Sequence, residues 1–264
     1  MTDLLIDGLP PTEDDLRYQA LVNYGAYTSF RVEAGGVRGL DLHLARLDAS
    51  AFELFGEVVG EARLRVLMQQ ALRERRDAWL RVSLFAPGLG ARTPSSRVRP
   101  KVMTAVSPPP APLARSVRVQ AQRLVRDDAH LKSTAIFPLI RARRLAQDAG
   151  FDDALFVDDQ GLISEGSLWN IGLLSGDVVT WPEAPMLHGV AKALISRGLA
   201  DFGFSAQART VRLADLAAFD GAFLCNSATP ACPVTAVGDH VFGAASDRIE
   251  RLAAAWASNP VQAI

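Results

Sequence analysis

The sequence lacks several features that would assign it quickly to a class of protein. Its 264 residues include two cysteines, Cys225 and Cys232, which are too few for a disulfide framework or a four-cysteine zinc site. The first residues contain no basic stretch followed by an apolar one, so no secretory signal is expected. No apolar run approaches the roughly 20 residues that a membrane-spanning helix needs. These absences together predict a cytoplasmic protein.

The sequence also has no surplus of positive charge. Lys and Arg number 28 and Asp and Glu number 29, which gives a formal net charge of −1. Nucleic-acid binding usually requires a basic surplus that displaces counterions, so this composition argues against a nucleic-acid partner. Hydrophobic residues make up 49% of the chain, which is enough to form a buried core.

Common catalytic motifs are absent as well. The chain has no GxGxxG, P-loop, HExxH or GxSxG pattern. Its four histidines are scattered without the spacing of metal ligands, so no metal site is predicted. The chemistry must therefore be sought in other polar residues.

The clearest linker signal is the proline-rich run SPPPAP at residues 107–112. Consecutive prolines have no backbone donor and hold the chain extended, so they interrupt helices and sheets. The run is also compatible with a surface loop inside one domain. We predict a small N-terminal α/β domain at residues 1–107, a linker at 108–114 and a larger α+β domain at 115–264.

Hydrophobic periodicity and turn residues give a coarse map of helices and strands. Helices are expected at about 42–55, 61–77, 138–147, 190–202 and 245–256. Strands are expected at about 27–33, 79–85, 98–106, 117–122, 154–157, 169–174, 178–181, 206–211, 222–225 and 234–237. Asp41 is expected to cap the first of these helices and Gly56 to end it. Strands outnumber what a regular alternation with helices would give, so the predicted fold class is α+β.

Two ionisable residues lie in mainly apolar segments. Lys132 occurs in the segment HLKSTAIF, where burial would lower the pKa of its amine and make it a nucleophile. The alternative is a lysine that extends to solvent. Glu165 lies between Ile163 and Trp169, so its carboxylate needs a cationic partner or incurs a cost of burial. The alternative is a glutamate at the edge of a loop.

Two further features suit an anion. The segment Leu187–Ala191 leads into a helix, and the free N–H groups of a helix start can bind phosphate, with Gly189 allowing close approach. Arg46 lies on the first long helix and could reach an anion. Most helix starts bind only water, and most helix arginines are solvated, so neither feature is decisive alone.

Taken together, these segments resemble the class IV aminotransferases, the fold-type IV family of pyridoxal-phosphate (PLP) enzymes. The family includes branched-chain and D-amino-acid aminotransferases and 4-amino-4-deoxychorismate lyase. The matching segments follow in order along nearly the whole chain: Tyr24–Tyr27, His43–Leu47, Leu131–Lys132, Asp153–Asp158, Ile163–Gly166, Asn170, Leu187–Val190, Cys225–Ala228 and Pro233–Val234. The resemblance implies a two-domain fold like that of D-amino-acid aminotransferase, with the cofactor between the domains, and a homodimer.

The resemblance also implies roles for single residues. Lys132 would form the Schiff base with PLP and later move the proton. Glu165 would pair with the pyridine nitrogen, which keeps the ring able to absorb electrons. Arg46 would hold the phosphate, together with Gly189 and the backbone N–H groups of residues 190 and 191.

Four further positions match the family less directly. Ser227 and Ala228 correspond to a second turn on the phosphate side. Tyr27 and Arg81 correspond to positions that line the substrate pocket. Ser227 and Ala228 are therefore predicted to bind the cofactor, and Tyr27 and Arg81 are predicted to bind the substrate.

The sequence departs from the aminotransferases of this family at two positions. Ala191 stands where many members have a threonine, and losing one such hydrogen bond costs roughly 1 kcal/mol. Phe137 stands where branched-chain enzymes have a tyrosine, which argues against a branched-chain assignment. Cys225-Asn226, Tyr27-Thr28-Ser29 and the residue at 191 look more like the lyase branch.

Three functions are compatible with this resemblance. The main expectation is transamination between an amino acid or amine and a 2-keto acid. The first alternative is 4-amino-4-deoxychorismate lyase, which releases pyruvate and p-aminobenzoate. The second is a protein of the same fold that binds PLP or another ligand without turnover.

Overall fold

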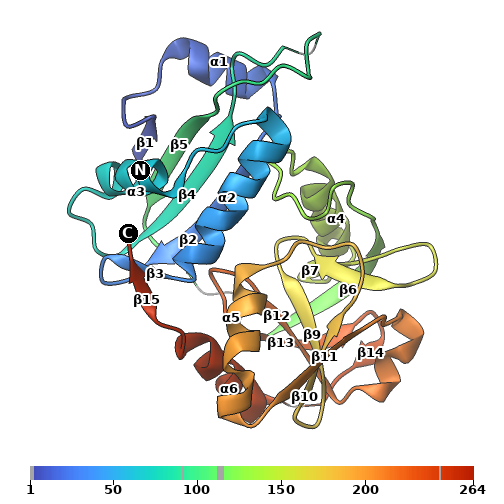
Figure 1. Cartoon of the computed structure of the whole chain (residues 1–264). Coiled ribbons are helices and arrows are strands. Elements are labelled where there is room, and N and C mark those ends of the chain that lie inside the picture. Colours follow the sequence, from blue (N-terminus) through green and yellow to red (C-terminus); the bar gives the residue numbers. More distant parts are fainter. Residues whose placement is uncertain (1–2, 91, 112–115, 244) are drawn as a thin grey trace. The chain divides into compact units, whose positions relative to one another are not determined.

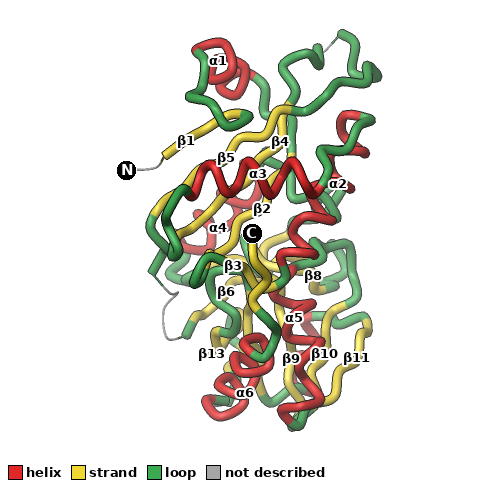
Figure 2. The backbone as a smooth tube through the Cα atoms, turned by 60° about the vertical axis from the view of Figure 1, so that its left-hand side comes forward, coloured by secondary structure: helices red, strands yellow, loops and turns green. Residues whose placement is uncertain are grey.

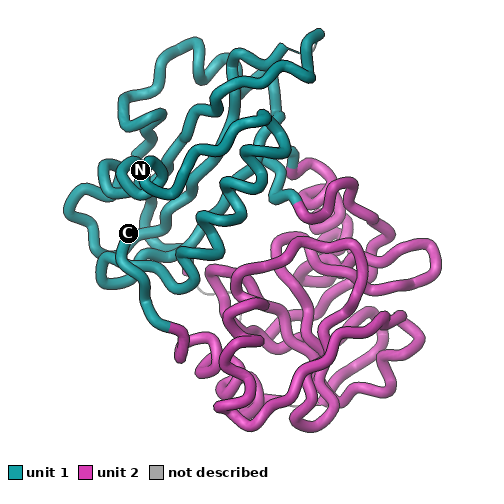
Figure 3. The backbone as a smooth tube through the Cα atoms, viewed as in Figure 1, with its two compact units in different colours: residues 1–110, 131–135, 260–264 teal, residues 111–130, 136–259 magenta. Residues whose placement is uncertain are grey.

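The computed structural model of the chain describes residues 3–90, 92–111, 116–243 and 245–264. The chain divides into two compact units (Figure 3). Unit 1 comprises Met1–Pro110, Leu131–Ala135 and Pro260–Ile264, and unit 2 comprises Ala111–His130 and Ile136–Asn259. The expected linker at 108–114 is described only as far as residue 111, and its other residues lie outside the described ranges.

Unit 1 includes two segments that the sequence placed in the C-terminal domain. The N–H of Tyr27 donates to the carbonyl oxygen of Lys132 at 2.9 Å, and Ala26 forms a β-bridge with Ser133. The terminal strand β15 (Val261–Ala263) pairs antiparallel with β3 (Gly36–Arg38). Both pairings join residues far apart in sequence. A single domain boundary at the proline-rich run therefore does not account for these two segments, which follow the run but belong to unit 1.

Unit 1 is an antiparallel sheet covered by helices. The strand order is β1 (Asp3–Ile6), β5 (Lys101–Ser107), β4 (Ala78–Phe85) and β2 (Ala26–Val32). Helices α2 (Leu40–Phe55) and α3 (Glu61–Leu72) pack on the sheet, as Figure 2 shows. Helix α1 (Glu13–Leu21) begins after Thr12, whose side chain caps it. The buried core between helices and sheet includes Leu44, Leu47, Leu64, Met68, Leu80 and Val82.

Two expectations for these helices are wrong. Asp41 does not cap α2, because the helix already begins at Leu40 after Gly39, and Asp41 lies in its first turn. The second helix ends at Leu72 rather than near residue 77. Residues 73–77 are all charged and offer no apolar face to bury, and Arg73 has a φ of 54°, which ends the helix. The expected end of α2 at Gly56 is confirmed, with a φ of 76°.

Unit 2 is built on a sheet that closes on itself. The strands follow the order β11-β10-β9-β12-β13-β6-β7-β8, β14 pairs with β13, and β8 also pairs with β9. The bounds are β6 Val117–Arg123, β7 Asp153–Val157, β8 Ile163–Gly166, β9 Asn170–Ser175, β10 Val178–Pro182, β11 Ser205–Arg209, β12 Gly221–Cys225, β13 Cys232–Val237 and β14 His240–Val241. Closure buries Val119, Leu155, Ile163 and Leu224 in one core. Parallel and antiparallel pairs occur together, and helices do not alternate regularly with the strands, so the predicted α+β class is confirmed.

Three helices pack on the strands of unit 2 (Figure 1). α4 (Phe137–Asp148) packs on β6 and β7, while α5 (Val190–Gly198) and α6 (Ser246–Ala257) pack on each other. A Cβ at Gly198 would lie 2.3 Å from the carbonyl oxygen of Ala255, so glycine permits this close approach. The chain continues from α5 into the 3₁₀ helix η1 (Leu199–Phe202), and a second 3₁₀ helix, η2, spans Leu213–Ala218. In the described part of the chain, no helix has both the length and the apolar character needed to cross a membrane.

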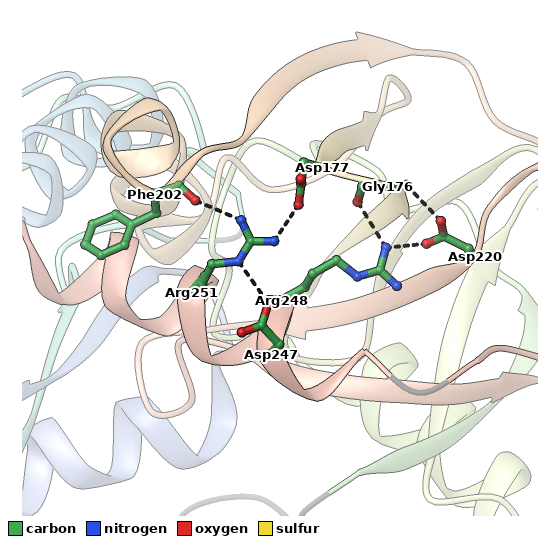
Figure 4. A network of polar contacts seen from close by, with 7 residues as sticks. All are labelled: Gly176, Asp177, Phe202, Asp220, Asp247, Arg248 and Arg251. Carbon is green, nitrogen blue, oxygen red and sulfur yellow. Dashed lines mark hydrogen bonds and ion pairs between the residues drawn. The ribbon is translucent and has the colours of Figure 1, made fainter.

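Arg251 of α6 connects this helix to two neighbouring segments (Figure 4). Its guanidinium donates to the carbonyl oxygen of Phe202 at 3.1 Å and to Asp177 in the turn between β9 and β10. It also forms an ion pair with Asp247 at 3.2 Å. The helix that packs on α5 is thereby fixed to the end of the β9–β10 hairpin.

Arg248 makes a second set of contacts one turn earlier on α6 (Figure 4). It donates to the carbonyl oxygen of Gly176 at 3.0 Å and forms an ion pair with Asp220. Asp220 also accepts the N–H of Gly176 at 2.8 Å. Partial burial would raise the pKa of Asp220, but the Gly176 N–H and Arg248 outweigh it and hold the pKa below 3.8.

We expect Asp220→Asn to destabilise the protein in a pH-dependent way. A carboxylate whose pKa is lowered by folding stabilises the native state above about pH 4, and this contribution disappears as the pH falls through the native pKa. Because the side chain is half-exposed, the loss at pH 7 should be only about 0.5–1 kcal/mol. Denaturant unfolding at pH 7 and pH 3 measures the difference, which should shrink at pH 3. Asp201→Asn, at an exposed position, serves as the control, and an equal loss at both pH values would contradict the prediction.

Candidate active site

Lys132 is placed in unit 1 by strand pairing. Residues 131–135 run beside β2, where the N–H of Thr134 donates to the carbonyl oxygen of Gly25 at 2.9 Å. A Cβ at Gly25 would lie 2.2 Å from the carbonyl oxygen of Leu84, so the glycine lets the chain approach β4 closely. The Nζ of Lys132 lies 4.9 Å from the centre of the Tyr27 ring, which is buried on β2. Two residues about a hundred positions apart are thus brought together.

Arg46 is held by neutral groups rather than by a carboxylate. Its Nη2 donates to Thr28 Oγ1 at 2.5 Å and lies 3.3 Å from His43 Nδ1, which is 2.6 Å from the same hydroxyl. Burial, together with the charges of Arg46 and Lys132, holds the pKa of His43 well below 6.5, so the imidazole is neutral at pH 7. Its Nδ1 can therefore accept a hydrogen bond from Thr28.

The electrostatics of Arg46 favour an anion. Burial lowers the pKa of its guanidinium to about 10, and its buried Nε has no hydrogen-bond partner among the described residues. In the ranges that the structure describes, Arg46 forms no ion pair within 4 Å. A buried donor without an acceptor is costly, and a bound anion would remove this cost.

Arg81 lies on β4 beside Tyr27. Its guanidinium carbon is 3.7 Å from the centre of the Tyr27 ring, and its Nε donates to Ser83 Oγ at 3.2 Å. Burial lowers the pKa of Arg81 as well. Unit 1 therefore gathers Tyr27, Arg81 and Lys132 in one cluster, and the predicted Tyr27 and Arg81 are indeed neighbours.

Glu165 lies on β8 of unit 2 and has a buried counterion. Its Oε1 accepts a hydrogen bond from Nη1 of Arg126 at 2.7 Å, and both side chains are largely buried. Arg126 also donates to the carbonyl oxygen of Ala129 at 3.0 Å. The sequence predicted that this carboxylate needs a cation but did not identify Arg126, because 39 residues separate the pair.

The turn after Glu165 is fixed by a buried carboxylate. Asp153 on β7 accepts hydrogen bonds from Ser167 Oγ at 2.6 Å and from Trp169 Nε1 at 3.1 Å. A Cβ at Gly166 would lie 2.1 Å from the Trp169 ring, so only glycine lets this indole cover the strand. These contacts set the position of β8 and hence of Glu165.

Asn170 connects Glu165 to the start of α5. It pairs with Glu165 between β8 and β9, and its Nδ2 donates to the carbonyl oxygen of Leu187 at 2.9 Å. A Cβ at Gly189 would lie 2.0 Å from Asn170 Oδ1. Glycine at 189 is thus required by the Asn170 carboxamide, and no described side chain caps the helix that follows. The predicted residues Val190 and Ala191 occupy its first turn.

The second predicted phosphate turn is less open than expected. The N–H groups of Ala228 and Thr229 both donate to Asn226 Oδ1, at 2.9 and 2.8 Å. The amide of Ala228 is therefore engaged within its own turn. Ser227 is half-buried beside it.

The site residues thus form one cluster in each unit. In unit 1 the cluster is cationic and surrounds Tyr27, and in unit 2 it combines a buried Glu165–Arg126 pair with an uncapped helix start. Over the described residues, no group of three or more His, Cys, Asp or Glu side chains is placed to hold a metal ion. Three residues that contact the predicted site residues were not identified from the sequence, namely His43, Thr28 and Arg126.

Two relatives of known name are similar to this chain in sequence. A protein of Methanocaldococcus jannaschii with the provisional name branched-chain-amino-acid aminotransferase is 25% identical over 230 residues, covering 82% of this chain and 80% of the relative. The D-alanine aminotransferase of Bacillus licheniformis is 24% identical over 241 residues, covering 83% and 81%.

Solved structures are similar in fold. A hypothetical aminotransferase of Mycobacterium tuberculosis, solved in a PLP-bound form, has a TM-score of 0.79 at 20% identity and covers 98% of this chain and 98% of that one. A Legionella pneumophila protein with the provisional name 4-amino-4-deoxychorismate lyase has a TM-score of 0.80 at 20% identity, covering 94% and 95%. At these identities the likeness establishes the fold.

The family model described as amino-transferase class IV matches residues 25–237. This range includes Arg46, Lys132, Glu165 and Ala191, and it extends through both units. The chain therefore belongs to the class IV aminotransferase family, as the order of its motifs predicted.

Proposed function

We propose that this chain is a PLP-dependent aminotransferase that moves an amino group between an amino acid or amine and a 2-keto acid. The observation that carries the proposal is the cluster in unit 1, where Lys132 and the half-buried Arg81 both lie at the Tyr27 ring, in a chain of this family. We also propose that the protein acts as a homodimer.

The residues fit a phosphate-bearing cofactor. Arg46 has a buried donor without an acceptor among the described residues, and the first turn of α5 offers backbone N–H groups with no side-chain cap. We assign the phosphate to Arg46, to Gly189–Ala191 and to Ser227. The N–H of Ala228 is not included, because Asn226 already accepts it.

PLP, when bound, supplies an electron sink that makes a proton on the substrate carbon removable. In this proposal Nζ of Lys132 would hold the cofactor through its aldehyde carbon and, once the substrate amine has displaced it, the freed amine would move that proton. Glu165 keeps the pyridine nitrogen protonated through a charge-assisted hydrogen bond. Arg126 donates to Oε1 of Glu165 at 2.7 Å and so fixes the orientation of the carboxylate that would face the cofactor.

Arg81 supports a carboxylate-bearing substrate. Its guanidinium is half-buried, stacks on Tyr27 and forms no ion pair in the portion of the chain described. A substrate carboxylate would satisfy this charge in a bidentate way. Amino acids and keto acids both carry that group.

Substitution of Lys132 tests the covalent link. Lys132→Ala should abolish the visible absorption band of the lysine-bound cofactor and reduce turnover by about 1000-fold. Borohydride reduction followed by peptide mapping should place the cofactor on the Lys132 peptide. The only other lysines are Lys101 and Lys192, so labelling of either would refute the assignment. A wild-type protein that stays colourless with PLP would instead indicate binding of another ligand without turnover.

The role of Glu165 is tested by its amide. Glu165→Gln keeps an oxygen that can accept from Arg126, so the protein should fold and bind PLP. Proton removal should slow about 100-fold, because the amide does not keep the pyridine nitrogen protonated. Exchange of the substrate α-proton for deuterium measures this step. Glu183→Gln, at an exposed position, is the control, and a near-normal exchange rate in the Glu165 variant would reject the role.

The lyase is the second candidate, because Ala191 lacks the hydroxyl that many aminotransferases have there. A transaminase should lose its yellow colour with certain L-amino acids, D-amino acids or amines and regain it with a keto acid. It should release no pyruvate from 4-amino-4-deoxychorismate when no amino acceptor is present. Pyruvate release under that condition, without any colour change by the donor panel, would assign the chain to the lyase instead.

A further inference from the structure

Lys192 is a half-buried lysine that the roles above do not use. It lies in the first turn of α5, directly after Ala191. Its Nζ lies 3.7 Å from Met186 Sδ and 5.4 Å from the centre of the Trp181 ring. A thioether is a weak acceptor and an indole ring gives only a cation–π contact, so these groups do not satisfy three N–H donors.

Lys192 has no dedicated counterion in the described residues. Lys101, in contrast, forms an ion pair with the buried Asp15 at 2.6 Å. Glu165 lies within electrostatic range of Lys192, but Arg126 already pairs with its Oε1 at 2.7 Å. Burial raises the pKa of the nearby Cys225 thiol to about 12, so this group is neutral at pH 7.

The position of Lys192 on its helix makes its uncompensated positive charge still less favourable. A cation in the first turn opposes the helix dipole, whose N-terminal end is already positive. Burial also lowers the pKa of Lys192, and the nearby Glu165 offsets this only in part. Both effects are relieved when an anion binds at the start of α5.

The ammonium group lies on the side of the helix start that faces the preceding segment. Met186 Sδ, which is 3.7 Å from Lys192 Nζ, is also 3.7 Å from Asn170 Nδ2. The oxygen of the same carboxamide lies against Gly189. Lys192 therefore extends toward the residues that shape the predicted phosphate cradle.

We propose that Lys192 binds the cofactor phosphate directly and replaces the hydroxyl that Ala191 does not provide. An ammonium group and a threonine hydroxyl both donate to phosphate oxygens, and the ammonium adds a charge. The proposal rests on the proposed function, because it assumes that α5 receives the phosphate of a pyridoxal-type cofactor.

Two ligands that differ only in the phosphate isolate this contact. Pyridoxamine 5'-phosphate and pyridoxamine lack the aldehyde, so their affinity does not depend on a covalent bond to any lysine. In Lys192→Met the affinity for pyridoxamine 5'-phosphate should fall about 10- to 100-fold, while that for pyridoxamine should stay within about twofold. Lys192→Arg should recover most of the loss. Arg197→Gln removes a cation from the exposed last turn of the same helix and should change neither affinity.

Thermal unfolding separates phosphate binding from a structural role. Without ligand, Lys192→Met should be at least as stable as the wild type, because an uncompensated half-buried charge is removed. With pyridoxamine 5'-phosphate its gain in melting temperature should be smaller than that of the wild type. A variant that loses stability without ligand, or loses affinity equally for both ligands, would overturn the proposal.

The wild type distinguishes failure of the Lys192 role from failure of the proposed function. If it binds pyridoxamine 5'-phosphate more tightly than pyridoxamine, and Lys192→Met preserves that preference, the role of Lys192 is wrong while the proposed function stands. If the wild type shows no preference for the phosphate and no colour with PLP, the proposed function itself fails.

Discussion

Positive charge that is buried without a matching carboxylate is the constraint on which the candidate site depends. Arg46 is held by the Thr28 hydroxyl and by neutral His43, and its Nε has no partner among the described residues. Such an arrangement costs stability in the free protein, and nothing in unit 1 compensates it within the described contacts. Such a cost is expected at a site that binds an anionic ligand, because the free energy lost by burying the unpaired charge is recovered when the anion binds.

Glu165 shows the opposite arrangement, in which a buried charge is balanced in advance. Arg126 fixes one carboxylate oxygen, and Asp153 fixes the turn that follows the strand. A carboxylate that is already oriented loses little freedom when a pyridinium nitrogen approaches it. Unit 2 thus contains a preorganised anion, and unit 1 contains cations without a matching carboxylate among the described contacts. Under the proposed function, the first would bind a pyridinium nitrogen and the second a phosphate.

Local sequence patterns predicted the elements that depend on local chemistry. Gly56 ends α2 because glycine readily adopts the positive φ found there. The start of α5 at Val190 was also predicted, because a helix start depends on only a few adjacent residues. The membership of residues 131–135 in unit 1 depends on pairing with β2, about a hundred positions away, and no local pattern encodes that register. The partner of Glu165 could not be predicted for the same reason. Arg126 lies 39 residues away in sequence, and no local pattern distinguishes it from the other arginines.

Under the proposed role of Lys192, positions 191 and 192 would let a chain of this family keep a phosphate ligand while changing the group that binds it. A threonine at 191 would bring a hydroxyl to the first turn without adding charge, whereas Ala191 followed by Lys192 offers no hydroxyl but a flexible cation. The cation opposes the dipole of α5 in the free protein, so it reduces stability there, while the hydroxyl would be nearly neutral. A chain that uses the lysine should therefore depend more on its bound ligand for stability than one that uses the threonine, and the asymmetry follows from charge alone.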